Sequence, residues 1–198
     1  MFNFFKDKFK DESLEDQRKD LERFPKELSH ESLIGLDCDL LPGSTGDFGR
    51  CLTNPIPVNG PTGEIKYINR LRTNDGGLIF HRLGSNGTID IFETVSTGGK
   101  IWDILYLDMY HPRRSTIAPS GYNFSKFHEI FSRFAFGYFT NSFDPDFPFG
   151  LSLFIEKDLG GKSLVKKYEE VIKDKSKFIR PLEHIKKLDQ IKIEGRLA

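Results

Sequence analysis

The chain has 198 residues, of which 37% are hydrophobic and 29% are charged, a balance that excludes the disordered and fibrous classes of protein. Lysine plus arginine and aspartate plus glutamate both number 29, so the formal net charge is zero, which argues against a nucleic-acid-binding function. No segment is apolar over the length of a membrane span or a signal peptide, so we expect a soluble, cytoplasmic protein without integral membrane association.

Residues 1–30 are predicted to form a helical appendage to a single domain that spans residues 31–198. Phe2, Phe5 and Phe9 recur at helical spacing and form an aromatic stripe among lysines. Such a helix could lie on a membrane surface, but the acidic residues beside it oppose anionic lipid. We therefore favour docking of the appendage onto the domain.

An irregular segment follows between residues 40 and 63, where glycine, proline and asparagine are too dense for a helix or a long strand. We favour a covering loop stiffened by its prolines, and a functional loop is the alternative for so long a segment. Cys38 and Cys51 lack metal-binding spacing, so we expect free thiols, with a bridge across the loop as the alternative.

Four strand-like runs come next, each rich in β-branched and aromatic residues and separated from the next by glycine-containing turns. They are Glu64–Arg72, Leu78–Leu83, Thr88–Val95 and Ile101–Tyr110. The short connections predict an antiparallel four-stranded meander over about residues 64–110.

Helical spacing returns after the strands. Aromatic residues recur at three- and four-residue steps between residues 124 and 138, a pattern suited to covering a sheet. Ser163–Asp174 is predicted to be a second amphipathic helix, and residues 181–195 fit either a helix or an edge strand. The fold class is therefore α+β, with the meander covered by amphipathic, aromatic-rich helices.

Charged side chains interrupt the predicted strands. Asp103 and Asp108 lie in a strand that is apolar on both faces, and a buried carboxylate needs a partner. His81 and Arg82 in the second run could meet Asp103 or Asp90 across the sheet. We favour an internal salt-bridge ladder that fixes the strand register, with a polar pocket as the alternative. Clusters of His, Asp and Glu are common by chance, so we expect no metal ion and no cofactor.

Pro112 ends the last strand, because proline cannot donate to a ladder. Tyr110, His111, Arg113 and Arg114 then sit at the end of the sheet. Two guanidinium groups beside an imidazole suit a phosphate, a carboxylate or the acidic patch of a partner. They would equally suit the anchoring of a neighbouring loop or of the acidic N-terminal helix.

These sequence features predict one of two alternative functions. The first is a small protein-interaction protein without catalytic activity, such as an antitoxin- or immunity-type neutraliser or an assembly adaptor, with a protein partner. The alternative is an enzyme or sensor for a phosphate- or carboxylate-bearing small ligand, with a His/Arg cluster as its site. The candidate binding residues are His81, Arg82, Asp103, Tyr110, His111, Arg113 and Arg114. No residue is predicted to be catalytic.

Overall fold

The computed structural model of the protein describes residues 35–125, 144–150 and 162–193. The predicted N-terminal appendage lies outside these residues, as does nearly all of the aromatic helix expected at residues 124–138. Within the described residues, no helix is long and apolar enough to cross a membrane.

The fold is α+β, and its main sheet has four strands in the order β1-β5-β4-β3. The strands are β1 (Ile56–Pro57), β3 (Leu78–Asn86), β4 (Ile89–Ser96) and β5 (Trp102–Asp108). The pairs β3–β4 and β4–β5 are antiparallel, whereas β1 runs parallel to β5. A second, two-stranded sheet pairs β2 (Leu71–Arg72) with β6 (Asn123–Phe124). The predicted class and the three later strands are therefore confirmed.

The first predicted strand is wrong, because residues 60–70 form helix α3 (Gly60–Arg70). Glu64, Tyr67, Ile68 and Leu71 are buried at helical spacing, which outweighs their β propensity. Gly60 has a φ of 74°, a left-handed conformation that glycine adopts without strain where the chain turns into the helix, and Pro61 in the first turn favours the helix start. The fourth strand of the sheet is instead β1, which comes from the segment predicted to be irregular.

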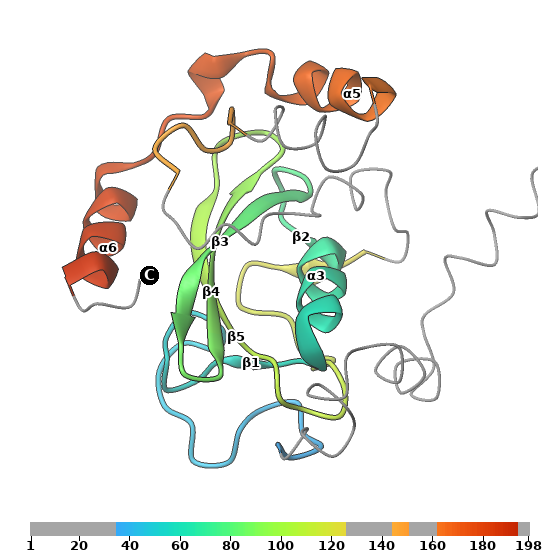
Figure 1. The fold of residues 1–198 in the computed structure, drawn as a ribbon, viewed down its shortest axis with the longest axis vertical. Coiled ribbons are helices and arrows are strands. Elements are labelled where there is room, and N and C mark those ends of the chain that lie inside the picture. The colour runs from blue at the N-terminus through green and yellow to red at the C-terminus, as the bar shows by residue number, and fades with distance from the viewer. Residues whose placement is uncertain (1–34, 126–143, 151–161, 194–198) are drawn as a thin grey trace, which may run out of the picture.

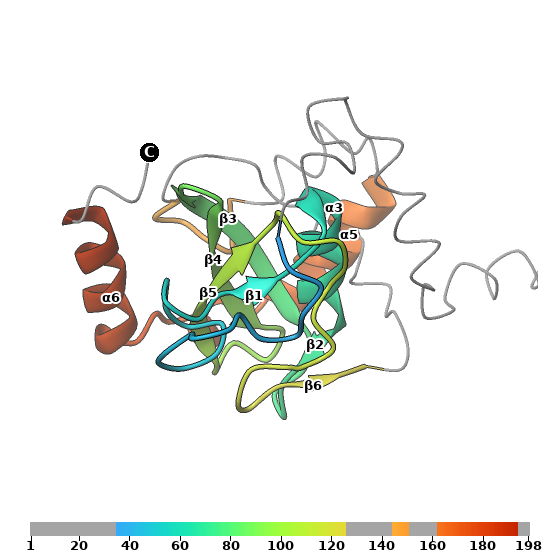
Figure 2. The same cartoon turned by 90° about the horizontal axis from the view of Figure 1, so that it is seen from below.

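One face of the sheet packs against α3. Phe80 and Phe92 meet edge to face with ring centroids 6.0 Å apart, and they form one apolar cluster with Leu105, Tyr67 and Ile68. Figure 1 shows α3 on this side of the sheet, and Figure 2 shows the same arrangement from below. This burial of aromatic and aliphatic surface explains why a strand-like sequence folds as a covering helix.

The other face is covered by the C-terminal part of the chain. This part contains α5 (Lys162–Ile172), a short 3-10 helix η5 (Lys175–Lys177) and α6 (Leu182–Ile193). Leu188 and Ile191 of α6 pack against Leu83, Ile91 and Ile104 of the sheet. The helix predicted at Ser163–Asp174 is thus confirmed, and the segment from residue 181 that could have been an edge strand is a helix.

Candidate functional site

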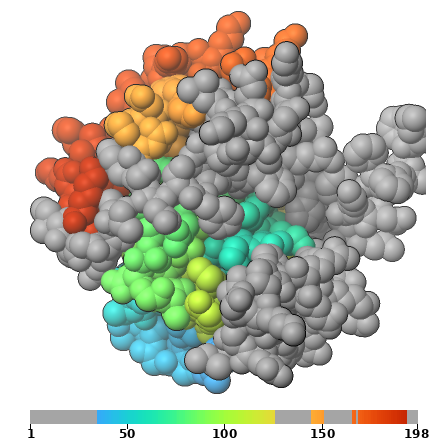
Figure 3. Space-filling view, in the orientation of Figure 1, coloured from blue at the N-terminus to red at the C-terminus, as the bar shows by residue number. Residues whose placement is uncertain are grey.

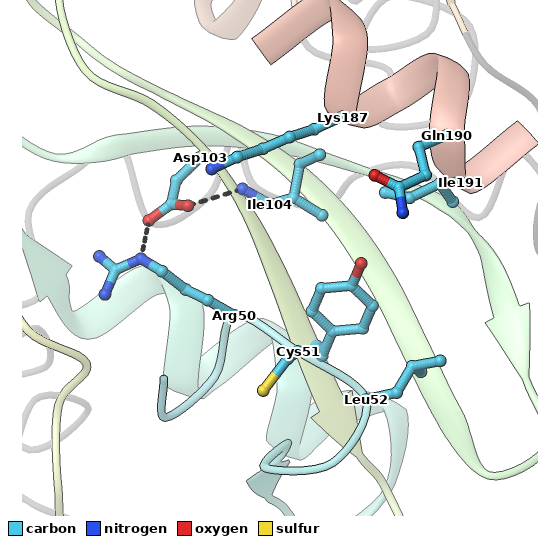
Figure 4. Close-up of a pocket in the computed structure, with 9 residues that line it drawn as sticks. Arg50, Cys51, Leu52, Asp103, Ile104, Lys187, Gln190 and Ile191 are labelled. Atoms are coloured by element: carbon cyan, nitrogen blue, oxygen red, sulfur yellow. Dashed lines mark hydrogen bonds and ion pairs between the residues drawn. The ribbon is translucent and has the colours of Figure 1, made fainter. Parts of the chain in front are cut away.

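A cavity of about 230 Å³ lies between the loop at residues 50–52, strand β5 and helix α6. Figure 4 shows the side chains around it. Its lining residues are Arg50, Cys51, Leu52, Asp103, Ile104, Tyr106, Lys187, Gln190 and Ile191. We refer to this cavity as the α6 pocket.

Arg50 is held in place at one end of the α6 pocket. Its Nε donates to Asp103 Oδ2 at 2.8 Å and its Nη2 to the carbonyl oxygen of Ser120 at 2.7 Å. The guanidinium also lies 5.5 Å from the centroid of the Tyr122 ring. Asp103 is fixed in turn, because Tyr122 Oη donates to Oδ2 at 3.1 Å and the Ile104 amide donates to Oδ1 at 2.9 Å. The result is a pre-positioned cation of the kind that binds carboxylate or phosphate.

Helix α6 supplies the opposite wall. Lys187 extends toward Asp103, and Gln190 lies farther from Asp103, beside Ile191 (Figure 4). Lys187 makes no ion pair with any residue of the described ranges. The α6 pocket therefore has two cationic side chains against one carboxylate, with Ile104 and Ile191 as apolar surface between its ends.

The position of α6 depends on a buried ionic cluster, the Glu93 clamp, which we define as Glu93, His81, Arg180 and His184. Glu93 Oε2 lies 2.7 Å from Nε2 of His81, and Oε1 lies 2.9 Å from Nε2 of His184. Arg180 adds a bidentate contact at 2.8 and 3.0 Å. Both Glu93 and His81 are fully buried. The clamp thus joins β3 and β4 to the segment that begins α6.

The Glu93 clamp shows why a charge can be buried here. Burial alone would raise the pKa of Glu93, but the hydrogen bonds from His184, His81 and Arg180 outweigh it and lower that pKa to about 2. The Phe147 ring stacks on His81 with centroids 4.2 Å apart, and the Arg180 guanidinium lies 5.5 Å from the Trp102 ring. Aromatic side chains therefore exclude water from the ion pairs.

The structure places the residues at the end of the sheet in intramolecular contacts. His111 is buried, with Nδ1 2.8 Å from the carbonyl oxygen of Leu36 and Nε2 3.2 Å from Asp108. Arg113 donates to Asp37, and to Asp39 at 2.7 Å. These contacts hold residues 36–39 against the segment that follows β5.

The remaining predicted site residues do not form one cluster. Arg82 donates to Asp90 at 2.7 Å, an internal salt bridge of the kind expected from the strands. Asp103 lines the α6 pocket, whereas His81 lies on the opposite face of the sheet, in the Glu93 clamp. Arg114 is buried, and Tyr110 is half-buried and forms an isolated bridge with Asn59. Within the described residues, no group of three or more His, Cys, Asp or Glu could hold a metal ion.

Sequence reasoning missed Arg50, Lys187 and Gln190. Arg50 lies in the segment that we predict to be a covering loop. Lys187 and Gln190 lie in a segment for which the sequence fits either a helix or an edge strand. A signal was present, because His184, Leu188 and Ile191 mark one buried helical face, which places Lys187 at its border. Comparison of the chain with protein-family models, with curated proteins and with solved structures found no match.

Proposed function

We propose that the protein binds a small carboxylate- or phosphate-bearing ligand in the α6 pocket, as a sensor or carrier in the cytoplasm. The observation that carries the proposal is the pairing of a fixed Arg50 guanidinium with an ammonium group, Lys187, around a single carboxylate. A ligand with one negative charge would balance the remaining positive charge.

The size and lining of the α6 pocket limit the ligand further. Its volume of about 230 Å³ is smaller than the roughly 300–1,000 Å³ of pockets that enclose drug-sized molecules. Leu52, Ile104 and Ile191 offer apolar walls. We therefore expect an anionic head at the Arg50 end and a short apolar body, with any second polar group near Gln190.

The test is calorimetric titration of the full chain with hexanoate, benzoate and phenyl phosphate, with hexanol and benzyl alcohol as neutral controls. We expect the anions to bind and the alcohols not to bind. Lys187→Gln should weaken binding about fivefold, the effect of one partly exposed ionic contact. Lys186→Gln is the matched control, because Lys186 is the adjacent exposed lysine and does not line the α6 pocket. Equal affinity of the two variants, or binding of the alcohols as well, would reject the proposal.

Protein interaction is the second candidate function. It is favoured by Leu36, Leu40 and Ile117, three exposed aliphatic residues beside the ion pairs of Arg113. A partner would contact this apolar surface together with the rim around Arg113, which is the surface predicted from the sequence. Size-exclusion chromatography of the native extract, with Leu40→Ser beside the wild type, tests it: a larger species that the variant loses supports the candidate.

A further inference from the structure

The C-terminal segment exposes a row of aliphatic side chains. Ile179, Leu182 and Ile185 are 71%, 77% and 38% exposed, and Ile179 and Leu182 are the two most exposed large hydrophobic residues in the described part of the chain. On α6, the buried residues His184 and Leu188 face the sheet, so Leu182 and Ile185 point away from it. We call these three residues the C-terminal stripe. Ile179 lies in the segment that precedes α6, and none of the three residues lines the α6 pocket.

The C-terminal stripe lies in a part of the sequence that is rich in basic residues. Residues 173–192 contain seven lysines and arginines against three acidic residues, but Arg180 belongs to the Glu93 clamp and Lys187 lines the α6 pocket, which leaves five lysines for the outer surface. Two of the acidic residues are already paired, Asp174 with Lys177 and Asp189 with Lys192, each at 3.7 Å. Lys186 is exposed and makes no ion pair within the described residues. The segment therefore combines protruding apolar groups with an excess of positive charge.

This composition fits a lipid surface better than a protein partner. Specific protein interfaces are centred on aromatic or arginine anchors and are depleted in lysine. Between residues 173 and 193 the single phenylalanine, Phe178, is buried, and there is no tryptophan or tyrosine. A stable dimer buries roughly 800 Å² per partner, which corresponds to about 20–30 residues a side, and the C-terminal stripe has only three aliphatic residues. A lipid surface does not require aromatic anchors, because protruding aliphatic side chains can enter the headgroup region while lysines contact anionic lipids.

We propose that the C-terminal stripe docks the protein reversibly on an anionic lipid surface. Ile179 and Leu182 would insert at the level of the headgroups, and the neighbouring lysines would contact the lipid phosphates and carboxylates. Figure 3 shows α6 at the outer edge of the molecule, where a flat surface can reach it. The contact would leave the sheet and the α6 pocket unchanged, so it is independent of the proposed ligand.

Sedimentation with vesicles tests this proposal. The wild-type chain is mixed with vesicles of phosphatidylcholine containing about 30% phosphatidylserine, and with vesicles of phosphatidylcholine alone. We expect binding to the first and little to the second, weakening strongly between about 0.1 and about 0.5 M NaCl. The variant Ile179→Ser/Leu182→Ser/Ile185→Ser should bind at least about tenfold more weakly. Lys186→Glu should also weaken binding, without loss of any apolar side chain.

A matched control comes from the other exposed aliphatic residues. Leu36→Ser/Leu40→Ser/Ile117→Ser removes the same number of aliphatic side chains from a separate surface, and it should bind vesicles like the wild type. Circular dichroism verifies that each variant is folded. Equal vesicle binding of the two triple variants, or no wild-type binding to anionic vesicles, would overturn the proposal. So would self-association that depends on the C-terminal stripe in analytical ultracentrifugation, because the occupant would then be a second copy of the chain.

Discussion

Replacement of Glu93 by glutamine should destabilise the protein by about 3 kcal/mol at neutral pH. The folded protein lowers the pKa of this carboxyl from 4.5 to about 2, and each pKa unit corresponds to about 1.4 kcal/mol. The loss of a single partner from a buried ion pair costs a similar amount, about 3–5 kcal/mol. In the variant, Arg180 would keep its charge in a site from which its bidentate acceptor has gone.

The pH dependence of this difference has a defined sign. A carboxyl whose pKa is lowered by folding stabilises the folded state fully above its unfolded pKa of 4.5. That contribution is lost as the pH falls from 4.5 through about 2, because the carboxylate is then protonated in the folded state as well. The wild type and Glu93→Gln should therefore differ most at pH 7 and converge in acid.

Urea unfolding followed by circular dichroism measures the free energy of unfolding. In thermal unfolding, about 3 kcal/mol should appear as a decrease in Tm of about 6–12 °C for a chain of this length. Glu183→Gln is the control, because it makes the same chemical change at an exposed position on α6 and should stay within about 0.5 kcal/mol. A cost below about 1 kcal/mol for Glu93→Gln would refute the view that the Glu93 clamp stabilises the fold.

Two further predictions concern the other face and the end of the sheet. Glu64 is fully buried, and burial together with the neighbouring Asp90 carboxyl raises its pKa well above 4.5. The unfolded chain releases this proton above pH 4.5 while the folded chain keeps it, so stability falls as the pH rises. Glu64→Gln should therefore raise the Tm at pH 8 but not at pH 4, and a pH-independent effect would contradict this. Arg113→Ala should cost about 1 kcal/mol and speed limited proteolysis between residues 35 and 41, because Asp37 and Asp39 lose their partner. Lys100→Ala, at an exposed position, should be cleaved like the wild type.

Local patterns were enough to predict part of the fold. Strands β3, β4 and β5 are short runs rich in apolar residues, and turns that contain glycine separate them. Their hairpin connections are therefore encoded by the local sequence. Helix α3 was missed because Ile65, Tyr67 and Ile68 have high β propensity. Its helical state depends on packing against Phe80 and Leu105, which lie beyond the local sequence.

The candidate site was less predictable, because its contacts join distant parts of the chain. Arg50 and Asp103 are 53 residues apart, and the residues that contribute the α6 wall come much later in the sequence. The contacts of His111 and Arg113 were unpredictable for the same reason, because their partners precede them by 75 and 76 residues. Pairing of neighbouring strands can predict the two contacts within the β3–β4 hairpin, Arg82 with Asp90 and His81 with Glu93, whose partners are 8 and 12 residues apart.

The Glu93 clamp also has a consequence for the order of synthesis. Glu93 precedes Arg180 and His184 by 87 and 91 residues, a distance that translation at about 5–20 residues per second covers in roughly 4–18 s. During that interval the three hairpin strands can pair and α3 can cover one face. The other face presents a carboxylate and several aliphatic side chains without the cations and apolar residues of the C-terminal segment. Each nascent chain therefore passes through a period of several seconds in which this face is open to aggregation or to a chaperone.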